Sequence, residues 1–226
     1  MTRGILIIGN ESSLFTAVSA EAAKRVESFA SVLIPNRFPS LERGNIPTPK
    51  QDAVGGAIPL SWNPASSISA RTLVLAAENR LGQINDALLV CMPPVVFKTA
   101  ETLAPEEIEF FANEHIKSWL FLIRELIQYF NRAGSGTLSF IAPEVSFESK
   151  SVQADLLGPP TVASFRTFAQ CIFTTSASDT FALMGFNAPE AGADGEFAEW
   201  LFKAVDERAK KNRGRWLKFS KLKFFR

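Results

Sequence analysis

The stretch Ala76–Pro94, AAENRLGQINDALLVCMPP, decides the fold of this chain. Leu81-Gly82 ends a helical pattern, and every residue of the run Ala87–Cys91 is apolar. That run is too short for a globular helix, and an unbroken apolar run is typical of a strand covered on both faces. We therefore expect this strand to lie in the middle of a parallel sheet.

Length and composition predict one compact domain that spans residues 1–226. The chain is 46% apolar and long enough to bury a sizeable core. No apolar run approaches the ~20 residues of a membrane span, and no signal-peptide pattern precedes the first strand. These features predict a cytoplasmic protein.

Cys91 and Cys171 lie in an apparent strand and an apparent helix, which predicts reduced thiols of the core rather than a disulfide.

The N-terminal part has the order in which a Rossmann unit begins, with a strand, a glycine turn and a helix. The apolar run Gly4–Gly9 predicts the strand, and helical spacing follows from Ala17 to Val26. Ala30–Ile34 and Ala57–Trp62 predict two further strands, and Pro39–Gly56 between them predicts a long surface excursion. Together with the central strand, this pattern predicts a doubly wound parallel α/β sheet, a Rossmann-type three-layer sandwich.

Three motifs resemble those of the short-chain dehydrogenase/reductase family. Arg80–Asn85 resembles the family's helix end R-F-G-x-I-D, although its N-N-A-G is replaced by Cys91–Pro94. Glu114–Arg124, EHIKSWLFLIR, resembles V-N-L-x-G-x-F-L-L-T-R, and Gly134–Ile141 resembles G-x-G-x-I-V-N-I. The resemblance covers nearly the whole chain and implies the fold of NAD(P)-dependent oxidoreductases.

The resemblance implies weak NAD(P) binding or none. The family's G-x-x-x-G-x-G turn begins here at Gly9, and Ser13 and Phe15 replace its second and third glycines. Ser12 and Ser13 either offer hydroxyls and amides to an anion or cap the helix. Arg37 stands where family members choose between the two nicotinamide cofactors, and it suits either a 2′-phosphate or a solvated loop.

The catalytic residues that the resemblance leads us to expect are replaced. His115 stands at the family's Asn position, Ala142-Pro143 at its Ser, and Pro160 with Ser164 at our best placement of its Tyr and Lys. The chain has one tyrosine, Tyr129, in the preceding helix, and no Y-x-x-x-K. The usual proton transfer needs that phenol and ammonium, so we predict no catalytic residue of this kind.

Two readings of His115 remain open. It could form a replacement acid-base site with Glu144, which the fold would place near the same cleft, or it could be a hydrogen-bonded histidine of the helix layer. One His and two distant Cys offer no ligand spacing, so no metal site is predicted.

The helix around residues 114–130 carries more apolar surface than one core needs. Phe121 and Leu122 widen its apolar stripe, which predicts a homo-oligomer, either a dimer or a tetramer. The stripe itself comprises Ile116, Trp119, Leu120, Ile123, Leu126, Ile127 and Phe130.

The C-terminal part predicts a strand at Thr180–Met184, a helix at Glu196–Ala209 and a seventh strand at Gly214–Phe219. Residues 208–226 hold nine Lys or Arg and no acid, which leaves the rest of the chain at −8 (1 − 9). This segment either contacts nucleic acid or an anionic surface, or is an edge strand protected by lysines.

Three functions therefore compete. The first is a non-catalytic binding, assembly or regulatory subunit, with or without a retained nucleotide. The second is a divergent NAD(P)-dependent oxidoreductase that uses other residues. The third is a module that binds nucleic acid or an anionic surface through its basic C-terminus.

Overall fold

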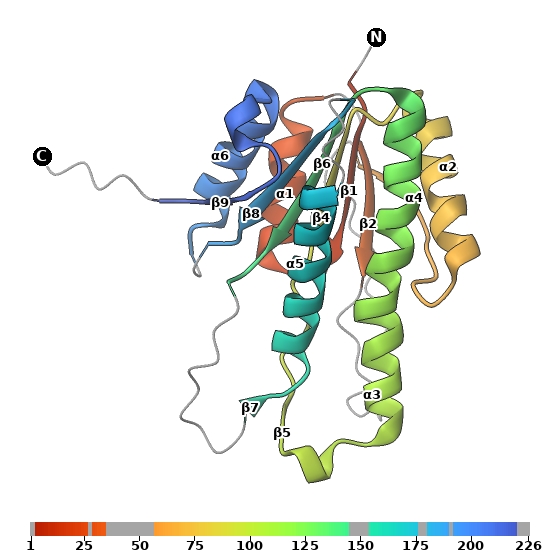
Figure 1. Ribbon diagram of the computed structural model, residues 1–226, viewed down its shortest axis with the longest axis vertical. Coiled ribbons are helices and arrows are strands. Elements are labelled where there is room, and N and C mark those ends of the chain that lie inside the picture. Colours follow the sequence, from red (N-terminus) through yellow and green to blue (C-terminus); the bar gives the residue numbers. More distant parts are fainter. Residues whose placement is uncertain are drawn as a thin grey trace, which may run out of the picture.

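The computed structural model describes residues 3–26, 29–34, 57–144, 154–175, 180–189 and 192–220. Its main sheet has seven strands in the order β3-β2-β1-β4-β6-β8-β9, and all neighbouring pairs are parallel. Helices cover both faces of the sheet (Figure 1). The expected doubly wound, Rossmann-type sandwich is confirmed.

The strands of the main sheet have lengths usual for globular proteins. They are β1 (Ile5–Asn10), β2 (Phe29–Ile34), β3 (Ala57–Pro59), β4 (Asp86–Val90), β6 (Thr137–Ala142), β8 (Ala182–Asn187) and β9 (Trp216–Lys218).

Six α-helices lie among the described residues, together with a small antiparallel ribbon and three short helical turns. The helices are α1 (Ser13–Ala23), α2 (Ser67–Leu81), α3 (Pro105–Phe111), α4 (Ser118–Ala133), α5 (Gly158–Thr175) and α6 (Asp194–Glu207). The ribbon pairs β5 (Phe97–Lys98) with β7 (Ala154–Asp155). The turns are the 3₁₀ segments η1 (Ala100–Thr102) and η3 (Lys210–Asn212) and the π-helical η2 (Ala112–Lys117).

The central position of β4 is confirmed. This strand lies between β1 and β6, and all five of its residues are buried. Its register aligns Leu88 with Ile7 on one side and with Ser139 on the other. Its apolar side chains are needed because helices cover both faces of the sheet at this place.

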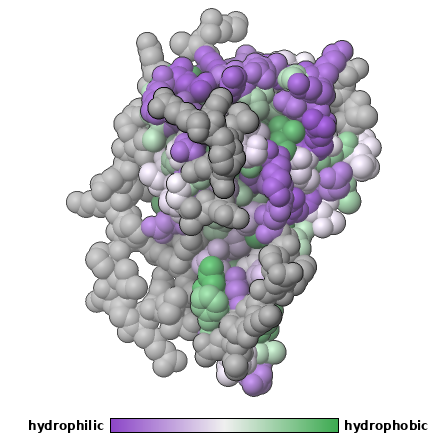
Figure 2. All heavy atoms as spheres, turned by 90° about the vertical axis from the view of Figure 1, so that its left-hand side faces the viewer, coloured by the Kyte–Doolittle hydropathy of each residue, from purple (hydrophilic) through white to green (hydrophobic). Residues whose placement is uncertain are grey.

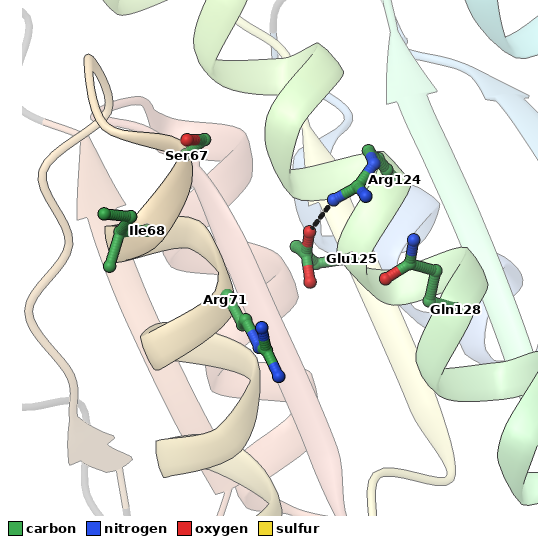
Figure 3. A pocket seen from close by; sticks show the side chains of 6 residues that line it. All are labelled: Ser67, Ile68, Arg71, Arg124, Glu125 and Gln128. Carbon is green, nitrogen blue, oxygen red and sulfur yellow. Dashed lines mark hydrogen bonds and ion pairs between the residues drawn. The ribbon is translucent and has the colours of Figure 1, made fainter.

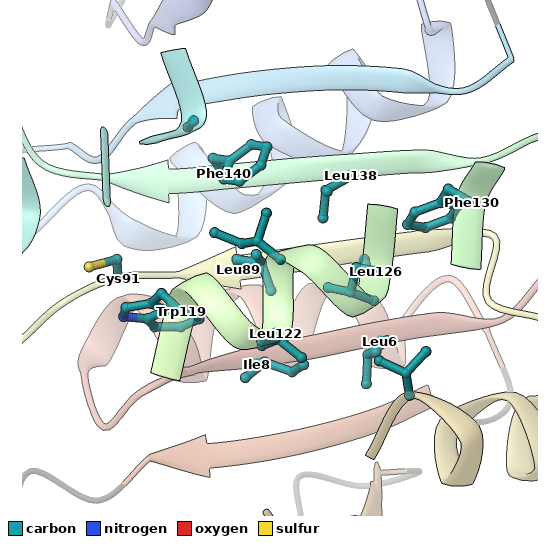
Figure 4. Packing of buried hydrophobic residues seen from close by; sticks show 14 of the residues in the cluster. Leu6, Ile8, Leu89, Cys91, Trp119, Leu122, Leu126, Phe130, Leu138 and Phe140 are labelled. Atoms are coloured by element: carbon teal, nitrogen blue, oxygen red, sulfur yellow. The ribbon is translucent and has the colours of Figure 1, made fainter. Parts of the chain in front are cut away.

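The two faces of the sheet carry separate hydrophobic cores. Helices α2, α4 and α5 cover one face, where Trp119 and Leu122 pack on Leu89 and Phe140 (Figure 4). Helices α1 and α6 cover the other face. Helix α6 packs inward there through Phe197, Leu201 and Val205, which are all fully buried.

Two N-terminal boundaries differ from the sequence expectation. Helix α1 begins at Ser13 rather than Ala17, because the Ser12 hydroxyl accepts a hydrogen bond from the Phe15 N–H at 3.1 Å and caps the helix. Strand β3 ends at Pro59, short of Trp62, whose ring meets that of Trp119 at 6.4 Å between centroids.

Three C-terminal boundaries also shift. Strand β8 covers Ala182–Asn187 rather than beginning at Thr180, and β9 is limited to Trp216–Lys218. Helix α6 ends at Glu207, before Ala209, because Arg208 adopts a left-handed conformation with φ 45°. Figure 1 shows β9 at the edge of the sheet.

The expected stripe of α4 is only partly correct. Ile116 and Leu120 are half-buried, whereas Leu122 and Tyr129 lie in the core. The π-turn η2 holds an extra residue, which shifts the helix face from the one that a regular α-helix would present. Leu122 is therefore a core residue and does not widen a second surface.

The two cysteines also differ from each other. Cys91 is buried as expected, but Cys171 is exposed, because Ile172 and Phe173 face the core at that turn of α5.

No helix among the described ranges is long and apolar enough to cross a membrane.

Candidate functional site

A cleft of about 270 Å³ opens where β4 and β6 end, beside the first turn of α5. The carboxyl ends of parallel strands are where ligands bind in doubly wound folds. Met92, Pro93 and Val95 form the wall after β4. Pro143 and Glu144 follow β6. Asp155 of β7 and three residues of α5, Gly158, Pro159 and Val162, form the remaining wall.

Asp155 fixes the start of α5 within this cleft. Its Oδ1 accepts hydrogen bonds from the backbone N–H groups of Val96 at 3.3 Å, Leu157 at 3.3 Å and Gly158 at 3.0 Å. A Cβ on Gly158 would lie 2.1 Å from Asp155 Oδ2. The carboxylate therefore occupies the space that a larger residue at position 158 would need.

Glu144 belongs to a polar cluster at the ends of β6 and β8. Its Oε1 accepts a hydrogen bond from Asn187 Nδ2 at 2.7 Å and lies 3.5 Å from Lys218 Nζ. Arg166 on α5 donates to Asn187 Oδ1 at 3.0 Å and stacks on Trp216, 3.8 Å from the ring centroid. Burial lowers the pKa of Arg166.

The positions assigned to the family's Tyr and Lys do not face this cleft. Pro160 is exposed, Ser164 is half-buried, and neither lines the cleft. Gly158 and Val162 do line it, and they lie four positions apart on α5, as do the Tyr and Lys of Y-x-x-x-K. The two cleft-lining residues thus have the spacing of the family's Tyr and Lys, and neither carries a titratable group.

His115 is buried and does not line the cleft. Only 1% of its surface is exposed, and its Nδ1 lies 3.2 Å from Nδ2 of Asn10 at the end of β1. Asn10 Oδ1 accepts the Met92 N–H at 3.0 Å, which turns its amide nitrogen toward the ring. No described residue bonds His115 Nε2. Burial lowers the pKa of His115 to about 4. His115 is therefore hydrogen-bonded to Asn10, in line with the second of its two readings, and no contact with Glu144 is found among the described residues.

The glycine turn after β1 is packed from within. Phe15 is 7% exposed, and a Cβ on Gly9 would lie 2.7 Å from its ring and 2.7 Å from Val90 Cβ. Phe15 therefore fills the core beneath α1 and does not project from the turn. Ser12 caps α1, which agrees with the second of its two readings, and Ser13 is exposed.

These residues differ in two respects from a phosphate cradle of the dinucleotide-binding kind. Such a cradle needs free backbone N–H groups at the helix N-terminus and room beside the first glycine. Here the Phe15 N–H is bonded to Ser12 Oγ, and Phe15 with Val90 fills the space beside Gly9. Arg37, the fourth expected contact, lies outside the described residues.

The single tyrosine has a structural role. Tyr129 is 2% exposed, and its hydroxyl accepts the Ile84 N–H at 2.8 Å. This bond joins α4 to the turn before β4.

No described group of three His, Cys, Asp or Glu side chains could share a metal ion.

The basic C-terminal segment uses two of its aromatic residues for packing. Trp216 packs against Phe173 and Arg166, and Phe219 packs against Phe197 and Trp200. Both rings are thus engaged within the domain. Figure 2 faces this side of the molecule, and hydrophilic side chains cover much of its upper part.

A second hollow, of about 220 Å³, lies between α2 and α4 (Figure 3). Ser67, Ile68 and Arg71 come from α2. The α4 side carries Gln128 and the ion pair between Arg124 and Glu125. This hollow contains both charge signs on exposed helix faces, and the cleft beside α5 is the more apolar of the two.

Four residues that shape these sites were not predicted from the sequence, namely Asn10, Asp155, Arg166 and Asn187. Asn10 and Asn187 each end a buried strand, and a polar residue at that point is a recognisable signal. Asp155 lies two residues before Leu157, and Asp commonly accepts a hydrogen bond from the backbone N–H two residues on. Arg166 carried no such signal.

Comparison with known proteins gives likeness at the level of structure. No protein-family model and no curated protein sequence matches the chain. A short-chain dehydrogenase/reductase from Serratia marcescens superposes with a TM-score of 0.73 at 12% identity, covering 96% of both chains. A short-chain dehydrogenase from Mycobacterium smegmatis gives 0.74 at 10% identity, covering 98% of this chain and 94% of the other.

The 3-ketoacyl-(acyl-carrier-protein) reductase from Brucella melitensis, solved with NADH, gives a TM-score of 0.71 at 15% identity and covers 96% of both chains. At such identities the likeness concerns the arrangement of the chain. Together with the parallel sheet order and the position of the cleft, it shows that this chain has the fold of the short-chain dehydrogenase/reductases.

Proposed function

We propose that this chain is a non-catalytic protein with the short-chain dehydrogenase/reductase fold, which binds a small ligand in the cleft beside α5. The observation that carries the proposal is the composition of the cleft. Where the fold's chemistry needs a phenol and an ammonium, the α5 wall presents Gly158, Pro159 and Val162, and Pro143 follows β6.

The two carboxylates of the cleft already have structural roles. Asp155 Oδ1 accepts three backbone N–H groups, and Glu144 is bonded to Asn187 and lies near Lys218. Neither has a histidine or tyrosine among the lining residues with which to relay a proton. The retained cleft therefore supports binding better than it supports proton transfer. A non-catalytic protein of this kind acts on partner proteins, as an assembly or regulatory subunit.

Nicotinamide cofactors are expected to bind weakly or not at all. The support is the packing of Gly9 against Phe15 and Val90 and the Ser12 cap on α1. A divergent oxidoreductase remains the competing function, because some neighbours in structure were solved with NAD or NADH. NADH and NADPH should leave the melting temperature unchanged, since only a ligand that binds the folded state raises it.

The experiment that tests the proposal measures carbonyl reduction. The wild type is incubated with a panel of aldehydes and ketones and with either cofactor, and we expect no turnover above background. The His115→Ala and Glu144→Gln variants serve as matched controls. Turnover in the wild type that either substitution abolished would establish a re-equipped active site and refute the non-catalytic proposal.

Self-association stays part of the proposal, as a dimer or tetramer. The prediction of an oligomer used Phe121 and Leu122 as exposed apolar surface, and Leu122 is buried in the core instead. Phe121 is half-buried and lies beneath Lys117, 5.9 Å from the ring centroid. Sedimentation equilibrium at micromolar concentration decides the point, and a monomer there would contradict it.

A further inference from the structure

The lining of the cleft beside α5 has a charge bias that its apolar surface does not require. Its polar side chains are the carboxylates of Glu144 and Asp155, and its other lining residues are apolar or glycine. The described lining contains no Lys, Arg or His. An apolar cleft with a few convergent polar groups is how small-molecule sites are built.

The Asp155 carboxylate has one oxygen committed to the protein and one that is not. Oδ1 accepts the backbone N–H groups of Val96, Leu157 and Gly158, so the side chain is held in place. No described residue donates a hydrogen bond to Oδ2, and Gly158 leaves the space for it. The free oxygen is therefore fixed in position before any ligand arrives.

The Glu144 carboxylate already attracts an ammonium group. Lys218 Nζ lies 3.5 Å from its Oε1, and the Lys218 side chain is 75% exposed. Asn187 Nδ2 donates to the same oxygen at 2.7 Å and so fixes the carboxylate. An exposed lysine is held loosely at such a contact, and the ammonium of a ligand could replace it.

We propose that this cleft binds a small primary amine, with its apolar part against Met92, Pro93 and Val162 and its ammonium group beside Glu144 and Asp155. The inference rests on the ligand-binding function proposed above and adds the charge of the ligand. A volume of about 270 Å³ limits the ligand to a small molecule, because clefts for drug-sized ligands start at ~300 Å³.

Three probes of equal chain length test the charge: hexylamine, hexanol and hexanoate, each titrated calorimetrically into the full chain. One exposed ion pair changes affinity by up to about fivefold, so two carboxylates should make hexylamine bind about tenfold more tightly than hexanol. Hexanoate should bind most weakly. The preference should shrink between about 0.01 M and 1 M salt, where the Debye length falls from ~30 Å to ~3 Å.

Variants assign the preference to the two carboxylates. Glu144→Gln and Asp155→Asn keep side-chain size, and Asn can still accept the backbone N–H groups that hold the start of α5. Each should lower the affinity for hexylamine about threefold and leave hexanol unchanged. Glu125→Gln, in the hollow between α2 and α4, is the matched control and should change neither. Thermal melts confirm that each variant is folded.

Lys218→Met gives a test in the opposite direction. Removing the ammonium that now lies near Glu144 should strengthen the binding of hexylamine a few-fold and leave hexanol unchanged. A loss of hexylamine binding in this variant would contradict the proposed exchange.

The outcomes separate this inference from the function on which it rests. Equal binding of hexylamine and hexanol, unchanged in all variants, overturns the amine preference and leaves an apolar ligand-binding cleft. Binding of none of the probes overturns the amine inference. Carbonyl turnover in the panel assay overturns the non-catalytic function, whatever the probes show.

Discussion

Asn10 Nδ2 lies 3.2 Å from His115 Nδ1, and this contact joins the end of β1 to the π-turn before α4. The two residues are 105 positions apart in the chain. Phe111 covers the imidazole at 4.7 Å between ring centroids. The buried ring accepts a hydrogen bond at Nδ1 and carries its proton on Nε2.

The buried imidazole predicts a pH dependence of stability. Burial lowers the pKa of His115 from 6.5 to about 4. The unfolded chain takes up a proton near pH 6.5, and the folded chain does so only near pH 4, so stability falls as the pH falls through this window. The contribution of this one group is roughly 3 kcal/mol between pH 7 and pH 4.

Urea unfolding at several pH values between 7 and 4 measures this dependence, with His115→Gln as the comparison. Gln cannot take up a proton in this range, so the slope of the unfolding free energy against pH should be smaller for the variant. Equal slopes for the two proteins would show that His115 is not the titrating group.

The Tyr129 hydroxyl predicts a stability loss without a functional one. Tyr129→Phe removes the acceptor of the Ile84 N–H, and a buried group left unsatisfied costs about 1–3 kcal/mol. Denaturant unfolding should show this loss, whereas ligand affinity should not change. A variant as stable as the wild type would mean that water replaces the hydroxyl.

The cysteines predict a difference in reactivity. Cys171 is exposed, whereas Cys91 is fully buried and burial raises the pKa of its thiol. A thiol reagent should therefore modify one cysteine of the native protein quickly and the second only after unfolding. Cys171→Ser should abolish the fast reaction, and fast modification of this variant would contradict the burial of Cys91.

Phe15 predicts that restoring a glycine turn will damage the protein. Phe15 is 7% exposed in the core beneath α1, and truncating a buried Phe costs about 3–5 kcal/mol. Ser13→Gly with Phe15→Gly should therefore unfold at much lower denaturant concentration than the wild type. Ser13→Gly alone, at an exposed position, is the control. A double variant of wild-type stability would contradict the packing role.

The fold was predictable because it depends on local patterns. The glycine stop at Gly82 and the apolar run of β4 are both readable in one window of sequence. The site was much less predictable. The cleft joins Met92, Glu144 and Asp155, which only the folded chain brings together. The π-turn before α4 also shifted the expected helix face, because apolar spacing assumes a regular helix.

The packing of Asp155 against Gly158 couples the stabilities of variants at these two positions. A Cβ at position 158 would lie 2.1 Å from Oδ2 and 2.9 Å from Cγ of Asp155. Asp155 can rotate away only by giving up the hydrogen bonds that Val96, Leu157 and Gly158 donate to Oδ1. Gly158→Ala should therefore lose the helix cap, which is worth about 0.5–2 kcal/mol.

A double-mutant cycle measures this coupling through the free energy of unfolding. Asp155→Ala alone should lose the same cap, and adding Gly158→Ala to it should then cost nothing further, because no carboxylate remains to be displaced. Additive losses would show that the two residues act independently. The same contact explains why a tyrosine cannot simply be placed at the cleft-facing position 158. The phenol that the fold's usual chemistry requires would have to displace the carboxylate that holds the start of α5.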